Sequence, residues 1–139
     1  AIRATYARAW RARPDAFSRD FAAVFDGPGP TAAALATARE AREALQRSVE
    51  AAFDTVDVLV TPTVPVVAPR IDTPIDGARL LQNTWAFNAA RVPAVSVPCG
   101  TGADGLPVGL QLAGRPFGDA ALLAVATLVE RLGGPGGAA

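Results

Sequence analysis

The strongest constraint on the fold is a set of short apolar runs spaced along the second half of the chain. Residues 57–61 form a β-branched run that ends at Pro62, and residues 94–97 and 108–113 form two more runs. The last two are apolar on both faces, which is typical of strands in a sheet that is covered on both sides. A three-stranded sheet of this kind leaves at least one apolar edge unpaired. We therefore expect a larger sheet, completed by a second chain, as in a homodimer, or by a missing piece of this chain.

Helical patterns flank these strands. In residues 31–54, apolar side chains recur every three to four positions, as in a long amphipathic helix, and Thr31 is placed to cap its start. Asp76 and Asp119 are placed to cap two later helices. Shorter helices are predicted over residues 1–13, 77–88 and 120–132, and four prolines predict an extended loop over residues 62–75. Helices around about three buried strands indicate an α/β fold.

The sequence divides into three parts. Residues 1–30 form an N-terminal helical segment that ends in a Gly-Pro-Gly-Pro loop, residues 31–134 form the main part, and residues 135–139 form a flexible tail. Basic and aromatic side chains in residues 1–13 are compatible with a helix that binds nucleic acid or a membrane surface. Because this stretch is short and the rest of the chain is neutral, we interpret it as a solvated arginine face over a docked aromatic edge.

Charge and hydropathy exclude two classes of partner. Thirteen basic residues balance thirteen acidic ones in the 139-residue chain, so its net charge provides no attraction to nucleic acid. The longest unbroken apolar run, residues 120–126, is far shorter than a membrane span. The first residues lack the apolar region of a signal peptide, so we expect a cytoplasmic protein with neither nucleic-acid nor membrane partners.

Missing residue types restrict the chemistry that this chain can perform. The sequence contains no His, and all of its basic residues are Arg, so no Ser-His-Asp, Ser-Lys or Cys-His arrangement can be assembled. Without His and with a single cysteine, we expect neither a metal site nor a cofactor. The sequence has no His or Lys that could activate the Cys99 thiol, so we expect a buried, inert side chain.

Three segments, in the same order, resemble the amidase signature family. The first is Asp-Val-Leu-Val-Thr-Pro-Thr at 57–63, which follows a long helix. The second is Thr-Trp-Ala-Phe-Asn at 84–88, followed by Val-Pro-Ala-Val-Ser-Val-Pro-Cys-Gly at 92–100. The third is Gly-Leu-Pro-Val-Gly-Leu-Gln-Leu-Ala-Gly at 105–114. Together these segments resemble the C-terminal third of the family, over about residues 31–132.

The resemblance implies a fold and an activity. Members of the family have a large α/β/α fold around a mixed sheet and hydrolyse carboxylic amides. The expected nucleophile is a serine activated by a second serine and a lysine, with backbone N–H groups as the oxyanion hole. In the family these groups lie N-terminal to the region that matches here. We therefore assign no catalytic residue in this chain and expect a missing N-terminal amidase portion to supply them.

The resemblance also implies part of a substrate site. In members that resemble fatty acid amide hydrolases, a helix just before the Asn at position 88 lines the acyl site at steps that map onto Ala78, Leu81 and Trp85. These positions share one helix face. We expect this face to bind a small-molecule amide substrate in the complete enzyme, and the alternative is ordinary core packing.

Two residues in this region depart from the pattern of the family. Two alternative functions also remain open. Arg91 stands where the family usually has Gly. Leu81 stands where the A-type chain of tRNA-dependent amidotransferases has an acidic residue that holds the glutamine ammonium, which favours an apolar or aromatic amide. The alternatives are such an A-type chain, with B-type and C-type partners, or a non-catalytic assembly or binding module derived from the amidase fold.

Four polar or small residues have predicted structural roles. Gln111 lies in an apolar strand and must find hydrogen-bond partners or lose about 1–3 kcal/mol on desolvation. Asn88 is placed to satisfy backbone groups of a loop. Gly109 and Gly114 are expected to permit a close backbone approach beside the third strand.

Overall fold

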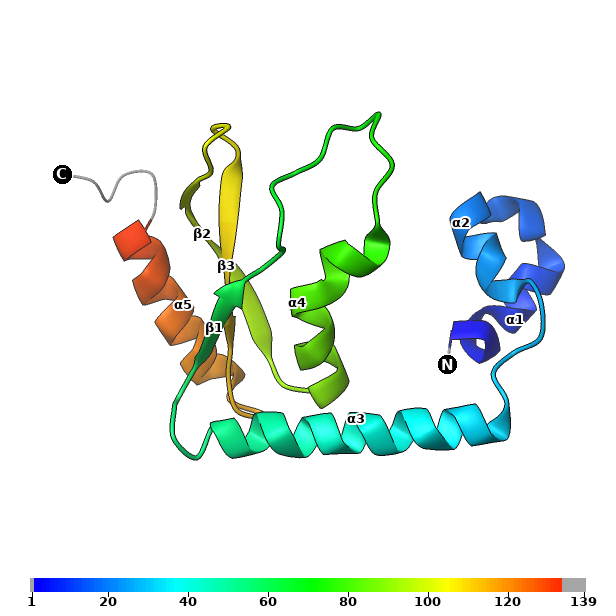
Figure 1. The fold of residues 1–139 in the computed structure, drawn as a ribbon, viewed down its shortest axis with the longest axis horizontal. Coiled ribbons are helices and arrows are strands. Elements are labelled where there is room, and N and C mark those ends of the chain that lie inside the picture. Colours follow the sequence, from blue (N-terminus) through cyan, green and yellow to red (C-terminus); the bar gives the residue numbers. More distant parts are fainter. Residues whose placement is uncertain (1, 134–139) are drawn as a thin grey trace. The chain divides into compact units, whose positions relative to one another are not determined.

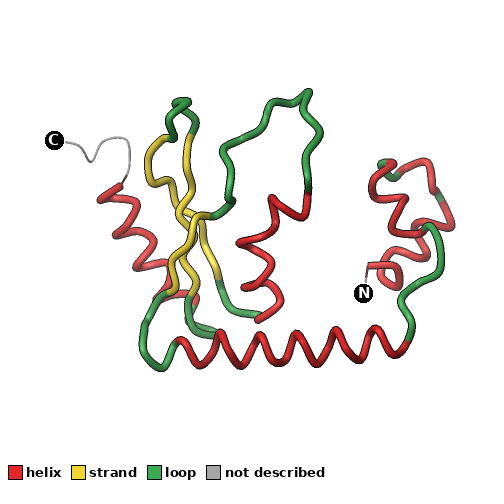
Figure 2. The backbone as a smooth tube through the Cα atoms, in the orientation of Figure 1, coloured by secondary structure: helices red, strands yellow, loops and turns green. Residues whose placement is uncertain are grey.

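The computed structural model describes residues 2–133, so the predicted tail at 135–139 lies outside the described residues. Contacts within the chain divide it into two compact units, residues 1–38 and residues 39–139. The described chain combines helices with a three-stranded sheet, in agreement with the predicted α/β class (Figures 1 and 2). None of the helices in the described part of the chain is long and apolar enough to cross a membrane.

The first unit is built around a cluster of aromatic rings. Its main helix, α1 (Ile2–Ala12), is followed by the single turns η1 (Pro14–Ala16), α2 (Arg19–Ala22) and η2 (Ala23–Phe25). Trp10 stacks on Phe25 at 4.7 Å between centroids, and Tyr6 meets Phe21 edge-on at 5.3 Å. Arg3 donates to the carbonyl of Gly27 at 2.8 Å and so holds the segment after η2 to α1. The aromatic stripe of α1 therefore packs within this unit.

The second unit contains most of helix α3 (Ala32–Ala52) and a sheet of three strands. β1 (Leu59–Pro62) and β2 (Ala94–Thr101) flank β3 (Pro107–Ala113), and both pairings are antiparallel. Leu112 of β3 lies opposite Val60 of β1 and Val95 of β2. The predicted three strands are confirmed, with the middle position taken by β3.

The strands are less buried than the sequence predicts, since a sheet covered on both faces was expected. The second half of β3 is buried, but β2 exposes most of its residues, and Val60 of β1 is 56% exposed. In the part of the chain that the structure describes, the outer edges of β1 and β2 pair with no further strand. Apolar strands with open edges are the arrangement that proteins normally avoid, because such edges promote association.

The two faces of the sheet are covered by different helices. On one face, Leu112 and Val97 pack against Leu122 and Ala126 of α5 (Asp119–Gly133). The opposite face carries Ala113, which packs with residues from α4 (Gly77–Ala90) and from the end of α3. Adjacent residues of a strand point to opposite faces, so Leu112 and Ala113 belong to separate cores. The unit is therefore layered, with helices on both sides of the sheet (Figure 1).

Candidate functional site

The two ends of α4 are fixed by local backbone chemistry. At its start, the Asp76 carboxylate accepts a hydrogen bond from the backbone N–H of Ala78 at 3.0 Å, as predicted. At its end, Arg91 adopts the left-handed conformation, with φ of 60°, and its N–H donates to the carbonyl of Asn88. A glycine adopts this conformation without strain, so Arg91 keeps the local turn at some conformational cost.

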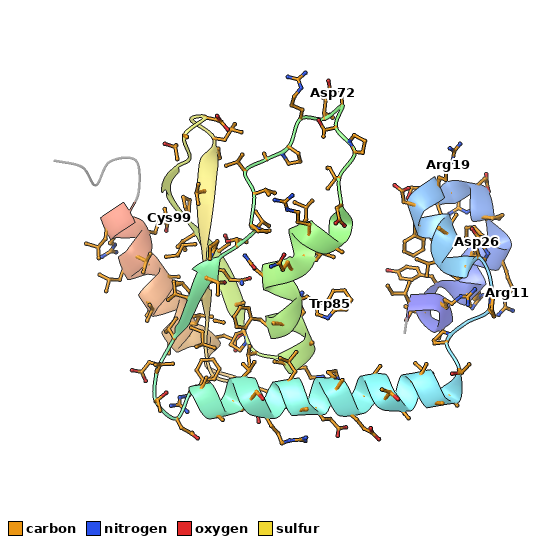
Figure 3. All side chains as sticks on the ribbon, viewed as in Figure 1. Arg11, Arg19, Asp26, Asp72, Trp85 and Cys99 are labelled. Atoms are coloured by element: carbon orange, nitrogen blue, oxygen red, sulfur yellow. The ribbon has the colours of Figure 1, made fainter. Side chains whose placement is uncertain are left out.

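The structure brings the three predicted pocket residues to one depression on α4. Ala78, Leu81 and Trp85 line it, and its volume is about 360 Å³. Leu81 is 48% exposed and Trp85 is 65% exposed. Trp85 projects from α4 away from the sheet (Figure 3). Within the described residues, these side chains are therefore not part of the core, and an apolar surface is left open.

The depression has three further lining residues, which the sequence pattern did not assign to it. They are Leu45 from α3 and Gln82 and Ala86 from α4. None of the lining residues is charged, and only Gln82 and the indole N–H of Trp85 have side-chain groups there that can form hydrogen bonds. Ligand pockets commonly combine an apolar lining with a few polar groups that orient the ligand. An apolar group that carries an amide matches this composition.

A polar network holds α4 to the sheet beside this depression. Gln111 is 4% exposed, and its Nε2 donates to Thr61 Oγ1 at 3.0 Å and to the backbone carbonyl of Asn83 at 3.1 Å. Asn83 Nδ2 in turn donates to the carbonyl of Pro62 at 2.9 Å. The partners expected for Gln111 are confirmed. They join the middle of α4 to both β3 and β1.

Close approach at Gly109 joins the loop after β1 to the sheet. Thr63 Oγ1 and Ser96 Oγ lie 2.5 Å apart, and a Cβ at Gly109 would lie 2.8 Å from each of them. The predicted role of Gly109 is therefore confirmed. At Gly114 a Cβ would meet Leu122 no closer than 3.4 Å, which is an ordinary contact, so the same prediction is wrong there.

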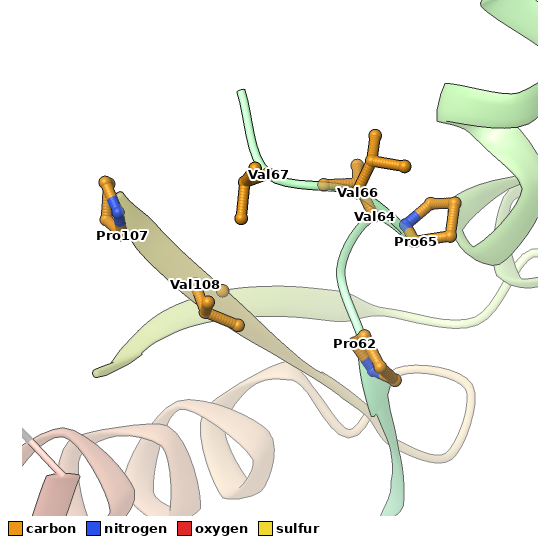
Figure 4. Close-up of a pocket in the computed structure, with 8 residues that line it drawn as sticks. Pro62, Val64, Pro65, Val66, Val67, Pro107 and Val108 are labelled. Carbon is orange, nitrogen blue, oxygen red and sulfur yellow. The ribbon is translucent and has the colours of Figure 1, made fainter. Parts of the chain in front are cut away.

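A second depression lies where the proline-rich loop passes β3. Its volume is about 250 Å³, and its lining is apolar, from Pro62, Val64, Pro65, Val66, Val67, Pro107, Val108 and Gly109 (Figure 4). Farther along this loop, the Arg70 guanidinium lies 3.0 Å from Asp72 and lowers the pKa of that carboxyl group. Both side chains are well exposed, so the ion pair adds little to stability.

The thiol of Cys99 lies on an exposed edge strand. The described residues contain no group of acidic or Cys side chains that could hold a metal ion. Cys99 is exposed, so its predicted burial is wrong. The physical reason is that β2 is an edge strand whose register shifts after Pro98, and beyond that point its residues face solvent. The thiol lies 3.5 Å from the carbonyl of Val108.

Comparison with known proteins identifies the family. The profile of the amidase family matches residues 8–123. The chain belongs to the amidase family. This amidase chain is 41% identical over 98 residues to the A-type chain of glutamyl-tRNA(Gln) amidotransferase from Thermodesulfovibrio yellowstonii, in a match that covers 68% of the chain and 20% of the relative. It is 42% identical over 90 residues to fatty acid amide hydrolase of Oryza sativa subsp. indica, which covers 58% of the chain and 15% of that relative.

A solved structure has the same fold. The crystal structure of an amidase superimposes with a TM-score of 0.81 at 27% identity, over 93% of this chain and 32% of the other. The chain spans about a fifth of the length of the curated amidotransferase chains that it matches. The amidase fold is therefore shown for this chain, over a minor part of the length of its relatives.

The three serines of this amidase chain all have local structural roles. Ser18 Oγ accepts from the N–H of Phe21 at 3.3 Å, Ser48 Oγ donates to the carbonyl of Ala44 at 3.1 Å, and Ser96 pairs with Thr63. Because the sequence has no Lys or His, this chain supplies no such base to any of these hydroxyls. The described residues therefore present an open apolar surface on α4 and no serine with a Lys or His partner of its own.

Proposed function

We propose that this amidase chain is the C-terminal third of a hydrolase that cleaves carboxylic amide C–N bonds. The order of the three family segments supports this position, since all of them belong to the C-terminal part of the family pattern. The chain also spans about a fifth of the length of its amidotransferase relatives, so most of a parent of that size lies outside it. In this proposal the chain supplies part of the fold and part of the substrate site.

The proposed division of labour follows from the chemistry. A serine outside this chain attacks the amide carbonyl, a lysine accepts its proton through a second serine, and backbone N–H groups stabilise the oxyanion. The C–N bond then breaks, the amine leaves with that proton, and water releases the acid from the serine ester. The α4 face contributes by holding the apolar part of the substrate in place, which keeps the carbonyl near the nucleophile. It also removes water from around the bound group. No proton transfer is assigned to a residue of this chain.

The observation that carries the proposal is the gathering of Ala78, Leu81 and Trp85 at one depression. Two large apolar side chains that are about half exposed or more, beside a small one, leave space for an apolar group. The absence of charge among the residues that line this depression favours an aliphatic or aromatic amide over glutamine, because the glutamine ammonium needs a carboxylate partner.

A second candidate is the A-type chain of a tRNA-dependent amidotransferase, with B-type and C-type partners. The identities of 41% and 45% to two such chains, each over 68% of this chain, favour it, compared with 42% over 58% for the plant fatty acid amide hydrolase. Leu81 counts against it, because it places an apolar side chain where an acidic one is expected. A non-catalytic assembly or binding module is the third candidate, favoured by the absence of Lys and His from the sequence.

An activity assay separates the three candidates. The product of the whole reading frame that contains this chain, and the 139-residue chain alone, are each tested with octanamide, benzamide and glutamine. The proposal predicts hydrolysis of the apolar amides by the whole product and none by the chain alone. Preference for glutamine supports the amidotransferase, and an inactive whole product supports the binding module. Turnover by the chain alone that Ser96→Ala abolishes contradicts the proposal.

A further inference from the structure

We propose that Leu45 of α3 is a specificity-determining residue, which forms the wall opposite α4 and limits the size of the apolar group that this site accepts. This inference rests on the proposed function. Leu45 lines the same depression as Ala78, Leu81 and Trp85, but it comes from a helix that lies far earlier in the sequence. No feature of the amidase resemblance assigns it a role.

The packing of α3 explains why Leu45 is held in this position. Leu45, Val49 and Phe53 follow one another at four-residue steps, which places them along one face of the helix or its immediate end. Phe53 is 1% exposed in the core, and Val49 packs against that core. Leu45 lies one turn farther from the core and is half-buried. The buried end of α3 therefore anchors a side chain that reaches the open depression.

In α4, as in α3, side chains are buried at the core and exposed beside the depression. Phe87 and Ala90 are buried in the core that contains Phe53, whereas Trp85 and Leu81 are largely exposed. α3 and α4 cross at a wide angle, as the ribbon shows (Figure 1). They meet at the core, and beyond it Leu45 and the α4 face line the open depression. Its width there depends on the side chain at position 45.

The length of the site along α4 follows from helix geometry. Ala78 and Trp85 are seven positions apart, which corresponds to about 10 Å along α4. An extended apolar chain can therefore run along this face, with Leu45 on its other side. A smaller residue at position 45 removes contacts from such a chain, and a larger one occupies part of the 360 Å³. Both changes alter preference between long and short amides.

The test uses the emission of Trp85 in the 139-residue chain. Trp10→Phe is the common background, which leaves Trp85 as the only tryptophan and retains an aromatic ring against Phe25. Octanamide and butanamide are the probes. We expect octanamide to shift the emission of Trp85 to shorter wavelength as it covers the indole, and to bind more tightly than butanamide.

The variants are chosen to isolate position 45. Leu45→Ala is expected to weaken octanamide binding about tenfold, since it removes methyl and methylene contacts with the chain. Leu45→Phe is expected to weaken octanamide more than butanamide by filling space. Leu35→Ala is the matched control, because Leu35 lies on the same helix, is 43% exposed and does not line the depression. Circular dichroism of each variant checks that it remains folded.

Two outcomes overturn the inference in distinguishable ways. If Leu81→Ala weakens octanamide binding but both Leu45 variants behave like Leu35→Ala, Leu45 sets no specificity and the proposed function of the α4 face stands. If octanamide at its solubility limit does not change the emission of Trp85, the α4 face binds no apolar amide in this chain. In that case the inference falls together with the binding role proposed for α4.

Discussion

The two faces of α4 are both apolar but have opposite surroundings. On the inner face, Phe87 is 7% exposed and Ala90 is fully buried against the end of α3 and the sheet. On the outer face, Trp85 is 65% exposed and Leu81 is 48% exposed. The packed face holds the fold together, and the open face presents a surface that the described residues leave uncovered. An apolar face that the fold does not use is most simply explained by a ligand or by further protein.

The largest expected effect comes from the packed face. Phe87→Ala should lower the free energy of unfolding by about 3–5 kcal/mol, because it leaves a cavity in the core. Trp85→Ala, two positions earlier, should change it by no more than about 0.5 kcal/mol, since it removes an exposed ring. Urea unfolding followed by circular dichroism measures both. Equal losses in the two variants would erase the distinction between the two faces.

A smaller effect is expected where the middle of α4 joins the sheet. Gln111→Leu removes two hydrogen bonds and leaves the Asn83 carbonyl and the Thr61 hydroxyl without this donor, at a cost of about 1–3 kcal/mol. Gln82→Leu makes the same chemical change on the exposed side of α4 and should leave stability nearly unchanged. The midpoints of urea unfolding compare the two. A neutral Gln111→Leu would mean that the network does not position α4.

The cap at the open end of α4 should contribute less. Asp76→Ala removes the hydrogen bond to the Ala78 N–H and should cost about 1 kcal/mol. Asp72→Ala, in the same loop, breaks only an exposed ion pair and should leave the midpoint of thermal unfolding unchanged. If both substitutions have the same effect, the loss reflects acidic charge in the loop and not capping.

The smallest effect has the opposite sign and lies at the packed end. Arg91→Gly should raise stability by about 0.5–1 kcal/mol, because glycine adopts the left-handed conformation without strain but loses more freedom on folding. Arg79→Gly, at a helical position of α4, should lower stability by a similar amount. Differential scanning calorimetry resolves the two directions. A destabilised Arg91→Gly would show that the arginine side chain stabilises this turn.

Local rules predicted much of the fold from the sequence. The long helix at 31–54 is observed at Ala32–Ala52, with Thr31 Oγ1 accepting from Ala34 N–H, because amphipathic periodicity and capping are local properties. β2 continues to Thr101, beyond the predicted end at Val97. Pro98 is tolerated there because β2 is an edge strand, where a proline need not donate to a neighbour. Whether a strand is at an edge depends on the whole sheet and cannot be read from one segment.

The candidate site was only partly predictable for the same reason. Spacing on one helix sufficed to group Ala78, Leu81 and Trp85. Leu45 was recognisable only as one member of the apolar stripe of its helix, because its position opposite α4 depends on how two helices cross. Cys99 shows the converse error, since apolar neighbours in the sequence suggested burial that an edge strand does not provide.

The central claim is that this chain provides fold and binding surface while the catalytic groups lie N-terminal to it. The most direct test is to sequence the DNA upstream of the codon for Ala1, in frame. We expect a lysine codon followed by a Gly/Ser-rich stretch with paired serines. A start codon shortly before Ala1, with no such stretch, would contradict it and favour the non-catalytic module.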